Sequence, residues 1–228
     1  MINSLKSLKD IEESISQEEL LARTKDLQKF NADDSLFYYG KEILGFGDFD
    51  ENVHEEWAVF LKGGKRLKLV LIPRGHFKST FFTIAYPLWE LGKDKTQRFL
   101  LANAVYGNAQ SFLRSIKGQV EKNPKLSWWD LEKGENWSDE ELTVKRETFH
   151  KEPSVSIAGI GSQLPSQHYD KIIWDDLVNE KNIATKDQAD KVISFWQDTL
   201  NLLDPGGLGI LIGTRWSYRD LYQYVIEN

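Results

Sequence analysis

The chain has 228 residues, of which 40% are hydrophobic and 28% charged, which is enough for one substantial globular core and argues against wholesale disorder. It contains no cysteine, so a disulfide scaffold, a thiolate metal site and a cysteine nucleophile are all excluded. The net charge of -6 argues against a generally basic surface but leaves room for a local patch of lysine and arginine that binds nucleic acid.

The N-terminal residues contain neither a signal-peptide core nor a membrane anchor. No apolar run in the sequence approaches the ~20 residues that span a bilayer, so we expect a soluble, intracellular protein. Residues 10–29 carry isoleucines and leucines at helical spacing among many charges, which predicts an amphipathic helix with little to bury alone. We assign residues 1–30 to an N-terminal helical arm and residues 31–228 to the main domain.

The next residues lead to a strand, a loop and a helix in succession. An aromatic segment, residues 31–49, and a helix predicted over residues 53–61 come first. Residues 69–72 are an apolar run followed by proline and glycine, which is typical of a short buried strand. Residues 79–91 lack glycine and place aromatic side chains at helical spacing. The loop between them therefore joins a predicted strand to the start of a predicted helix.

Lys78, Ser79 and Thr80 stand at the start of this helix. A helix N-terminus presents unpaired N–H groups and the positive end of the dipole, and a lysine adds a point charge, so the stretch has the chemistry of a phosphate-binding loop. It departs from the standard motif G-x-x-x-x-G-K-[ST], because Ile72 and Phe77 occupy the two glycine positions. An ordinary strand-to-helix turn with an exposed lysine is the alternative interpretation.

Strands and helices go on alternating along the chain. A short buried strand is predicted over residues 98–102 and an amphipathic helix over residues 106–122. Residues 123–140 contain a proline, a glycine and several tryptophans, and we interpret them as an insertion or loop. Residues 141–147 and 154–158 are predicted to be the strands of a hairpin. This alternation favours a parallel sheet with helices on its faces.

The second informative stretch is an apolar run over residues 169–174 that ends in Asp175 and Asp176. Open α/β sheets bind ligands at the carboxyl ends of their strands. Asp175 is suited to hold a Mg²⁺ ion together with Ser79, and Asp176 to orient or deprotonate a water molecule that attacks a γ-phosphate. Alternatively, the two acids only begin a turn. The Lys78 loop earlier in the chain favours the nucleotide-binding interpretation.

A third strand is predicted near the end of the sequence. A long helix over residues 184–203 precedes it, and the strand itself covers the apolar residues 208–212. Gly213, Thr214 and Arg215 follow directly, which places a hydroxyl and a guanidinium where they would sense a γ-phosphate. Arg215 could equally form a structural contact with a carboxylate.

With these motifs in order, the sequence resembles the ATPase domain of the large terminase subunit of tailed bacteriophages, the motor that pumps DNA into a preformed capsid. Four segments carry the resemblance over most of the chain, namely residues 37–45, 73–80, 168–176 and 212–216. The resemblance implies an α/β fold of the P-loop NTPase class (ASCE-type), with a mostly parallel central sheet flanked by helices and an N-terminal helical arm.

The resemblance also implies roles for individual residues, with ATP and Mg²⁺ as cofactors. The nucleotide-binding residues would be Arg74, Gly75, His76, Phe77, Lys78, Ser79 and Thr80, with His54 near the position that reads adenine. Ser79 and Asp175 would hold the metal. Asp176, Arg74 and Lys78 would be the catalytic residues. Gly213, Thr214 and Arg215 would couple phosphate occupancy to the next domain.

Three positions depart from the family pattern. Phe77 stands where terminases usually keep glycine, and Asp176 stands where a glutamate, longer by one methylene, is common. Gln167 occupies the place of an arginine that can reach the nucleotide of a neighbouring subunit. Arg74 is therefore the leading arginine for the γ-phosphate of its own subunit, ahead of Arg98, Arg114 and Arg146.

The function implied by the resemblance is an ATP-hydrolysing motor that translocates double-stranded DNA into a procapsid. The implied partners are double-stranded DNA, the portal protein, the small terminase subunit and further copies of the chain in a ring on the portal. We expect this complex in the host cell cytoplasm, without a membrane and outside the mature virion. Nothing in the sequence corresponds to the C-terminal nuclease domain of full-length terminases, so we expect no DNA cleavage by this chain. Two alternatives stay open: another P-loop DNA motor such as a helicase, and a catalytically inactive nucleotide-binding assembly module.

Overall fold

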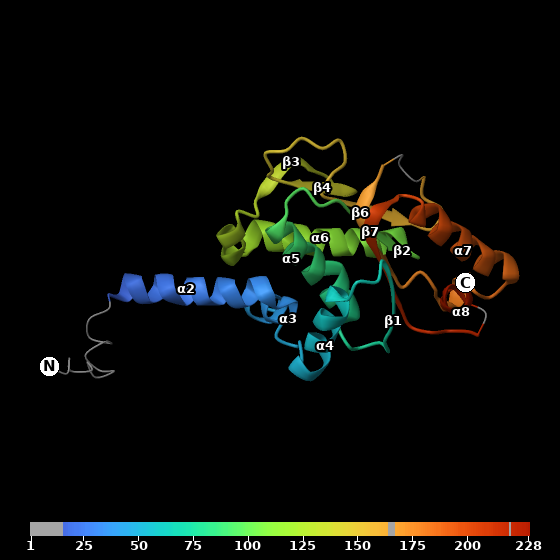
Figure 1. The fold of residues 1–228 in the computed structure, drawn as a ribbon. Helices are drawn as coiled ribbons and strands as arrows, with labels where there is room; N and C mark the ends of the chain where they lie inside the picture. Colours follow the sequence, from blue (N-terminus) through green and yellow to red (C-terminus); the bar gives the residue numbers. More distant parts are fainter. Residues whose placement is uncertain (1–15, 164–166, 219) are drawn as a thin grey trace.

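The fold is built on one β-sheet, shown in Figure 1, in a computed structural model that describes residues 16–163, 167–218 and 220–228. Within these residues the sheet has seven strands in the order β1-β7-β6-β2-β5-β4-β3. β1, β7, β6, β2 and β5 are parallel neighbours, and β4 and β3 add antiparallel pairs at one edge. The strands are β1 (Leu67–Leu71), β2 (Phe99–Asn103), β3 (Lys133–Trp137), β4 (Glu141–Val144), β5 (Val155–Gly159), β6 (Tyr169–Asp175) and β7 (Leu203–Gly213).

Helices cover both faces of this sheet, because successive residues of each strand point to opposite faces. Leu101 and Ile173 pack with the cluster that α4, η2, α5 and α6 complete, whereas Leu100 and Ile172 pack with α7 and α8. The helices are α2 (Gln17–Asp34), α3 (Leu36–Tyr38), η1 (Tyr39–Ile43), α4 (Glu51–Lys62), η2 (Thr80–Ala85), α5 (Tyr86–Lys93), α6 (Tyr106–Lys122), η3 (Pro124–Trp129), η4 (Glu180–Asn182), α7 (Lys186–Leu200) and α8 (Leu221–Glu227). The expected α/β class, a mostly parallel sheet flanked by helices, is confirmed.

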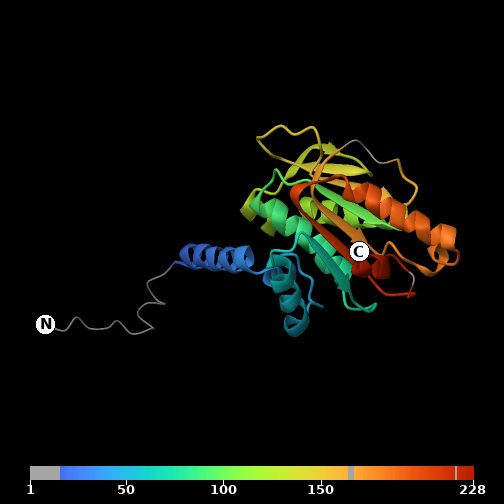
Figure 2. The ribbon, with the colours of Figure 1, turned by 45° about the vertical axis from the view of Figure 1, so that its right-hand side comes forward.

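Helix α2 extends away from the body of the molecule in both Figure 1 and Figure 2. It starts after the N-cap Ser16 and ends at Asp34, four residues beyond the predicted arm, while the predicted helical residues 10–15 lie outside the described residues. The helix is anchored from Lys25 onwards: Lys25 Nζ lies 5.7 Å from the centre of the Trp128 ring, Ala32 is buried, and the Ala32 carbonyl accepts a hydrogen bond from Trp89 Nε1 at 2.7 Å. None of the helices in the described part of the chain combines the length and apolar character that a membrane span requires.

Three stretches differ from the elements that we predicted. Residues 123–140, interpreted as a loop, contain η3 and the edge strand β3, whose polar and exposed residues show no apolar alternation. Strand β4 ends at Val144, earlier than predicted. Strand β7 begins at Leu203, earlier than the predicted residue 208, because residues 204–207 lie within the strand. The register of β7 against β6 shifts there, between Tyr169 and Lys171 of β6.

Candidate functional site

The carboxyl ends of β1, β6 and β7 meet at one edge of the sheet. β7 lies between the other two, with Leu71 of β1 opposite Gly213 of β7 and Asp175 of β6 opposite Ile212. Because all three strands are parallel, the segments that follow them leave the sheet on the same side. The loop before Lys78, the two acids and the residues after Gly213 are therefore brought together, as the sequence predicted.

Two residues of the loop after β1 adopt left-handed backbone conformations before the helix starts. Gly75 has φ of 84° and Phe77 has φ of 56°. Phe77 thus adopts a conformation that favours glycine, the residue that the P-loop motif has at this position. The first helical backbone bond runs from the Phe81 N–H to the Phe77 carbonyl at 2.9 Å, so Lys78, Ser79 and Thr80 occupy the first turn.

Lys78 and Asp176 form an ion pair at the bottom of this loop. Lys78 Nζ lies 3.0 Å from Asp176 Oδ2, and the lysine side chain is only 8% exposed. Asp176 itself has φ of 47° and its other carboxylate oxygen is buried without a hydrogen-bond partner among the described residues. The largely buried ammonium is thus held by a carboxylate whose side chain is 36% exposed, so solvent partly screens the attraction.

Asp175 is completely buried beside this pair. Burial raises the pKa of its carboxyl group to about 6, and the charge of Asp176 adds to this, while the Thr83 hydrogen bond, the neighbouring Ser79 hydroxyl and the charge of Lys78 oppose it. The Thr83 hydroxyl donates to Asp175 Oδ2 at 2.7 Å, whereas Oδ1 has no partner among the described residues. A buried carboxylate with a free oxygen has the chemistry that a hard cation requires.

Three further residues of the site escaped our sequence analysis. Thr83 lies one turn after Ser79, and helix phase alone could have indicated it. Asn103 ends β2 one residue beyond the predicted strand, and its amide donates to the Asp175 carbonyl at 2.7 Å. Tyr222 of α8 packs under Gly213: a Cβ on this glycine would lie 1.7 Å from the tyrosine oxygen. Burial, followed by the charge of Asp176, raises the pKa of Tyr222.

The residues after β7 contact the loop after β1. The Thr214 hydroxyl donates to the Ile72 carbonyl at 3.0 Å, and Arg74 Cζ lies 4.9 Å from the centre of the Trp216 ring. Arg215 points elsewhere, since its guanidinium donates to the side chain of Gln223 and lies over Tyr218. Thr214 and Arg74 therefore link the segment after β7 to the loop after β1. Arg215 links the same segment to α8.

His54 lies beneath the loop and is buried. Its ring stacks on Phe49, with 4.6 Å between ring centres and 16° between ring planes. The Asp50 N–H donates to Nδ1 at 2.9 Å, which leaves Nε2 to donate to the His76 carbonyl at 3.3 Å. Both ring nitrogens are thus taken by the protein backbone, and the adenine-reading role of His54 stays a prediction.

The other arginines considered for the γ-phosphate have partners of their own. Arg98 lies at the opposite end of the strands and donates twice to Asp170, at 2.9 Å each. Arg146 donates to the His150 and Glu152 carbonyls at 3.3 and 2.6 Å, and Arg114 contacts Ser111 on α6. Gln167 accepts a hydrogen bond from Tyr169 at 2.7 Å.

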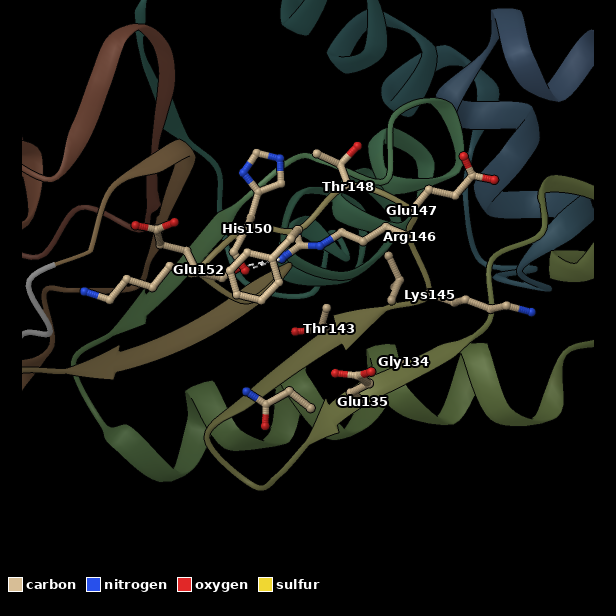
Figure 3. A pocket seen from close by; sticks show the side chains of 13 residues that line it. Gly134, Glu135, Thr143, Lys145, Arg146, Glu147, Thr148, His150 and Glu152 are labelled. Carbon is tan, nitrogen blue, oxygen red and sulfur yellow. Dashed lines mark hydrogen bonds between the residues drawn. The ribbon is translucent and has the colours of Figure 1, made fainter.

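Two cavities help to place the site. One of about 620 Å³ lies between β3, β4 and residues 145–152, and Figure 3 shows that both acidic and basic side chains line it. None of its lining residues belongs to β1, β6 or β7, whose carboxyl ends carry the candidate site. Another, of about 460 Å³, is lined by Gly45 and Phe46 together with Phe77 and Thr80 of the loop. The loop after β1 therefore has open space directly beside it.

Comparisons with known proteins point to one family. No protein-family model matches the sequence. The chain is 27% identical, over 175 residues, to the large terminase subunit of Enterobacteria phage T3, a match that covers 76% of this chain and 30% of that protein. The crystal structure of the HK97 bacteriophage large terminase has a similar fold, with a TM-score of 0.52 and 14% identity over 76% of this chain and 35% of that one. The resemblance to phage large terminases is confirmed over most of the chain, which spans about a third of the length of these relatives.

Proposed function

We propose, from the similarity to phage large terminases, that this chain is the ATP-hydrolysing motor domain of a DNA-packaging terminase. It would couple hydrolysis of Mg-ATP to the translocation of double-stranded DNA into a procapsid. One observation carries the proposal: Lys78 Nζ lies 3.0 Å from Asp176 Oδ2, beside the buried Asp175, where the ends of β1 and β6 meet. A lysine and two acids at strand ends are what phosphoryl transfer uses to bind phosphates and to position water.

The phosphates of ATP would bind at residues 74–80. Backbone N–H groups of the loop and of the first turn of the helix would bind the phosphates, and Lys78 would exchange Asp176 for phosphate oxygens. That exchange would free the Asp176 carboxylate to orient a water molecule or accept its proton. Arg74 would stabilise the charge on the γ-phosphate, since its guanidinium forms no hydrogen bond or ion pair within the described residues.

Asp175 and Ser79 are the residues that would hold Mg²⁺. The free, buried oxygen of Asp175 fits this ion, as does the neighbouring free oxygen of Asp176. No group of three acidic, histidine or cysteine side chains gathers for a metal in the described residues, so water and phosphate oxygens would complete the shell. When bound, Mg²⁺ neutralises charge on the phosphate oxygens.

Thr214 and Arg215 would carry the change at the phosphates to the rest of the motor. Thr214 touches the base of the phosphate loop through Ile72, and Arg215 touches α8 through Gln223. The partners that we propose are double-stranded DNA, the portal protein, the small terminase subunit and further copies of the chain in a ring. Contact with DNA would be electrostatic and independent of sequence. The place of action would be the host cell cytoplasm.

Steady-state phosphate release, measured with and without double-stranded DNA, tests this proposal. We expect Lys78→Ala to abolish ATP turnover while the protein stays folded. Lys171→Ala is a matched control, because Lys171 also forms a largely buried ion pair of 3.0 Å, with Glu90, away from the strand ends. The control should keep its turnover per folded molecule. Full activity of Lys78→Ala would refute the phosphate role.

A second function is favoured by the same ion pair. Because Asp176 already holds Lys78, the chain could bind nucleotide as an inactive assembly module. Such a module would bind ATP and release no phosphate, even with DNA present, whereas a motor would release phosphate faster when DNA is added.

A further inference from the structure

The guanidinium of Arg74 lies over the ring of Trp216 at the candidate site. Arg74 Cζ lies 4.9 Å from the centre of the Trp216 ring, and the indole is 37% exposed. Arg74 belongs to the loop after β1, whereas Trp216 follows β7, so the contact joins the tips of two separate loops. A guanidinium at this distance from an aromatic face is attracted by the ring quadrupole.

The bases of the two loops are also joined. The Ile72 N–H donates to the Gly213 carbonyl at 3.0 Å, and the Thr214 hydroxyl donates to the Ile72 carbonyl at 3.0 Å. The turn that carries the indole is fixed by Asp220, which is buried and accepts from the N–H groups of Trp216 and Ser217 at 3.3 and 3.2 Å. The hydrogen bonds to Asp220 fix the turn that carries the indole, and the hydrogen bonds of Ile72 fix the base of the loop that carries Arg74.

The contact with Trp216 leaves the N–H donors of the guanidinium without an acceptor. The group carries five N–H donors, and the indole has no atom that accepts a hydrogen bond from them. Within the described residues, Arg74 has no hydrogen bond or ion pair that would occupy these donors. Arg215 differs, since its guanidinium donates to Gln223 in addition to lying over Tyr218. Of the two arginines, Arg74 is the one whose donors remain available to an anion.

We propose that Trp216 is a positioning residue of the ATPase site, which holds the guanidinium of Arg74 so that its N–H edge meets the γ-phosphate in the transition state. This inference rests on the proposed function and assigns a role to a residue outside the phosphate loop. Since Trp216 acts through Arg74 on charge that develops during the reaction, its loss should lower kcat and leave KM nearly unchanged.

A double-mutant cycle tests the inference with double-stranded DNA present. We expect Trp216→Ala to lower kcat about tenfold and to change KM for Mg-ATP less than about twofold. In an Arg74→Ala background the same substitution should change kcat less than about twofold, because the group that it positions is gone. Trp216→Phe should restore most of kcat, since phenylalanine also offers an aromatic face.

Trp137→Ala is the matched control, because Trp137 also has a cation over its ring, with Lys117 Nζ 5.6 Å from the ring centre, and it lies on β3, at the edge of the sheet opposite β1. We expect its kcat to stay within about twofold of the wild type. Thermal unfolding of the same variants without nucleotide gives a second readout: the losses in Tm from Arg74→Ala and Trp216→Ala should not add, because the two side chains touch.

Equal losses of kcat from Trp216→Ala in both backgrounds, together with additive losses in Tm, would overturn the inference. A wild-type chain that binds ATP without releasing phosphate contradicts the proposed motor function instead, so the two failures are distinguishable.

Discussion

Phe77 takes, in the loop after β1, a backbone conformation that usually requires glycine. Its φ of 56° crowds an L side chain against its own backbone, which costs of the order of 1 kcal/mol. The benzyl group is 42% exposed and lines the cavity beside the loop. The loop after β1 therefore holds a non-glycine residue in a left-handed conformation at the expense of local strain.

Two substitutions at this position separate backbone strain from side-chain contacts. Phe77→Gly and Phe77→Ala both remove the ring, but only glycine is at ease at positive φ. We expect Phe77→Gly to be about 1 kcal/mol more stable than Phe77→Ala, as measured by denaturant unfolding. Equal stability of the two variants would contradict a left-handed conformation at this position.

Sequence reasoning reached some residues of the candidate site and missed others for physical reasons. Lys78 and Asp176 were predicted to belong to one nucleotide site, because parallel strands end at a common edge, and they lie 3.0 Å apart. That they would hold one another depends on side-chain conformations that motif spacing does not encode. Thr83 and Asn103 were missed because their contacts with Asp175 depend on helix phase and on the last residue of a strand.

Between elements, the tightest contact at the site is that of β7 with α8. Gly213 has no room for a Cβ, because the Tyr222 oxygen and Cζ would lie 1.7 and 2.2 Å from it. Tyr222 is itself buried and cannot move without disturbing α8. Packing against Tyr222 therefore also requires glycine at position 213, which the sequence analysis had assigned to a coupling motif.

We expect Gly213→Ala to destabilise the protein by about 1–3 kcal/mol through overpacking. Gly118→Ala is the control, since Gly118 lies within α6 with nothing within 4 Å of an added Cβ. Alanine there should instead stabilise by up to about 1 kcal/mol, because glycine is a poor helix former. Chemical unfolding of both variants checks the pair, and a tolerated Gly213→Ala would refute the close contact.

A second contact between elements joins β2, β6 and β7 at the far end of the sheet. Arg98 contacts Asp170 at 2.9 Å and Asp204 at 2.5 Å. Burial acts to raise the pKa of Asp170, but the hydrogen bonds and charge of Arg98 outweigh it, so the pKa is lowered. This arginine therefore serves the fold, away from the candidate site.

The lowered pKa of Asp170 gives the direction of a pH dependence. Stabilisation by the ionised carboxylate is present at neutral pH and is lost as pH falls through the lowered folded-state pKa. We expect Arg98→Met to cost about 2 kcal/mol at pH 7, because the pair is partly exposed, and less at pH 3. Unfolding at both pH values measures this. A cost that does not change with pH would contradict it.

Elements with strong apolar patterns were predicted well, and polar ones were not. The predicted bounds of α6, residues 106–122, match the structure, because its apolar residues recur at helical spacing. Strand β3 was missed, since an edge strand with mostly exposed residues has no apolar alternation. The start of β7 was placed too late, because residues 204–207 have turn chemistry and the strand accommodates them with a register shift.

For the whole molecule, the alternation of strands and helices was sufficient to predict the α/β class. The order of strands was not predicted, since sequence does not tell which strand lies beside β1. The structure places β7 between the strands of the lysine loop and of the two acids, which brings the third segment into the same site. Leu20, Leu21 and Phe30 of the projecting helix α2 are exposed, in a segment that was predicted to be amphipathic with little to bury alone.

Equilibrium titration of the folded wild type, Lys78→Ala and Lys171→Ala with Mg-ATP tests the proposed nucleotide site most directly. Nucleotide binding at residues 74–80 predicts saturable binding by the wild type and by Lys171→Ala. Lys78→Ala should bind at least about tenfold more weakly, because it lacks the positive charge that Lys78 would bring to the phosphates. A wild type that does not bind Mg-ATP, or a Lys78→Ala variant that binds it as tightly as the wild type, would contradict nucleotide binding at residues 74–80.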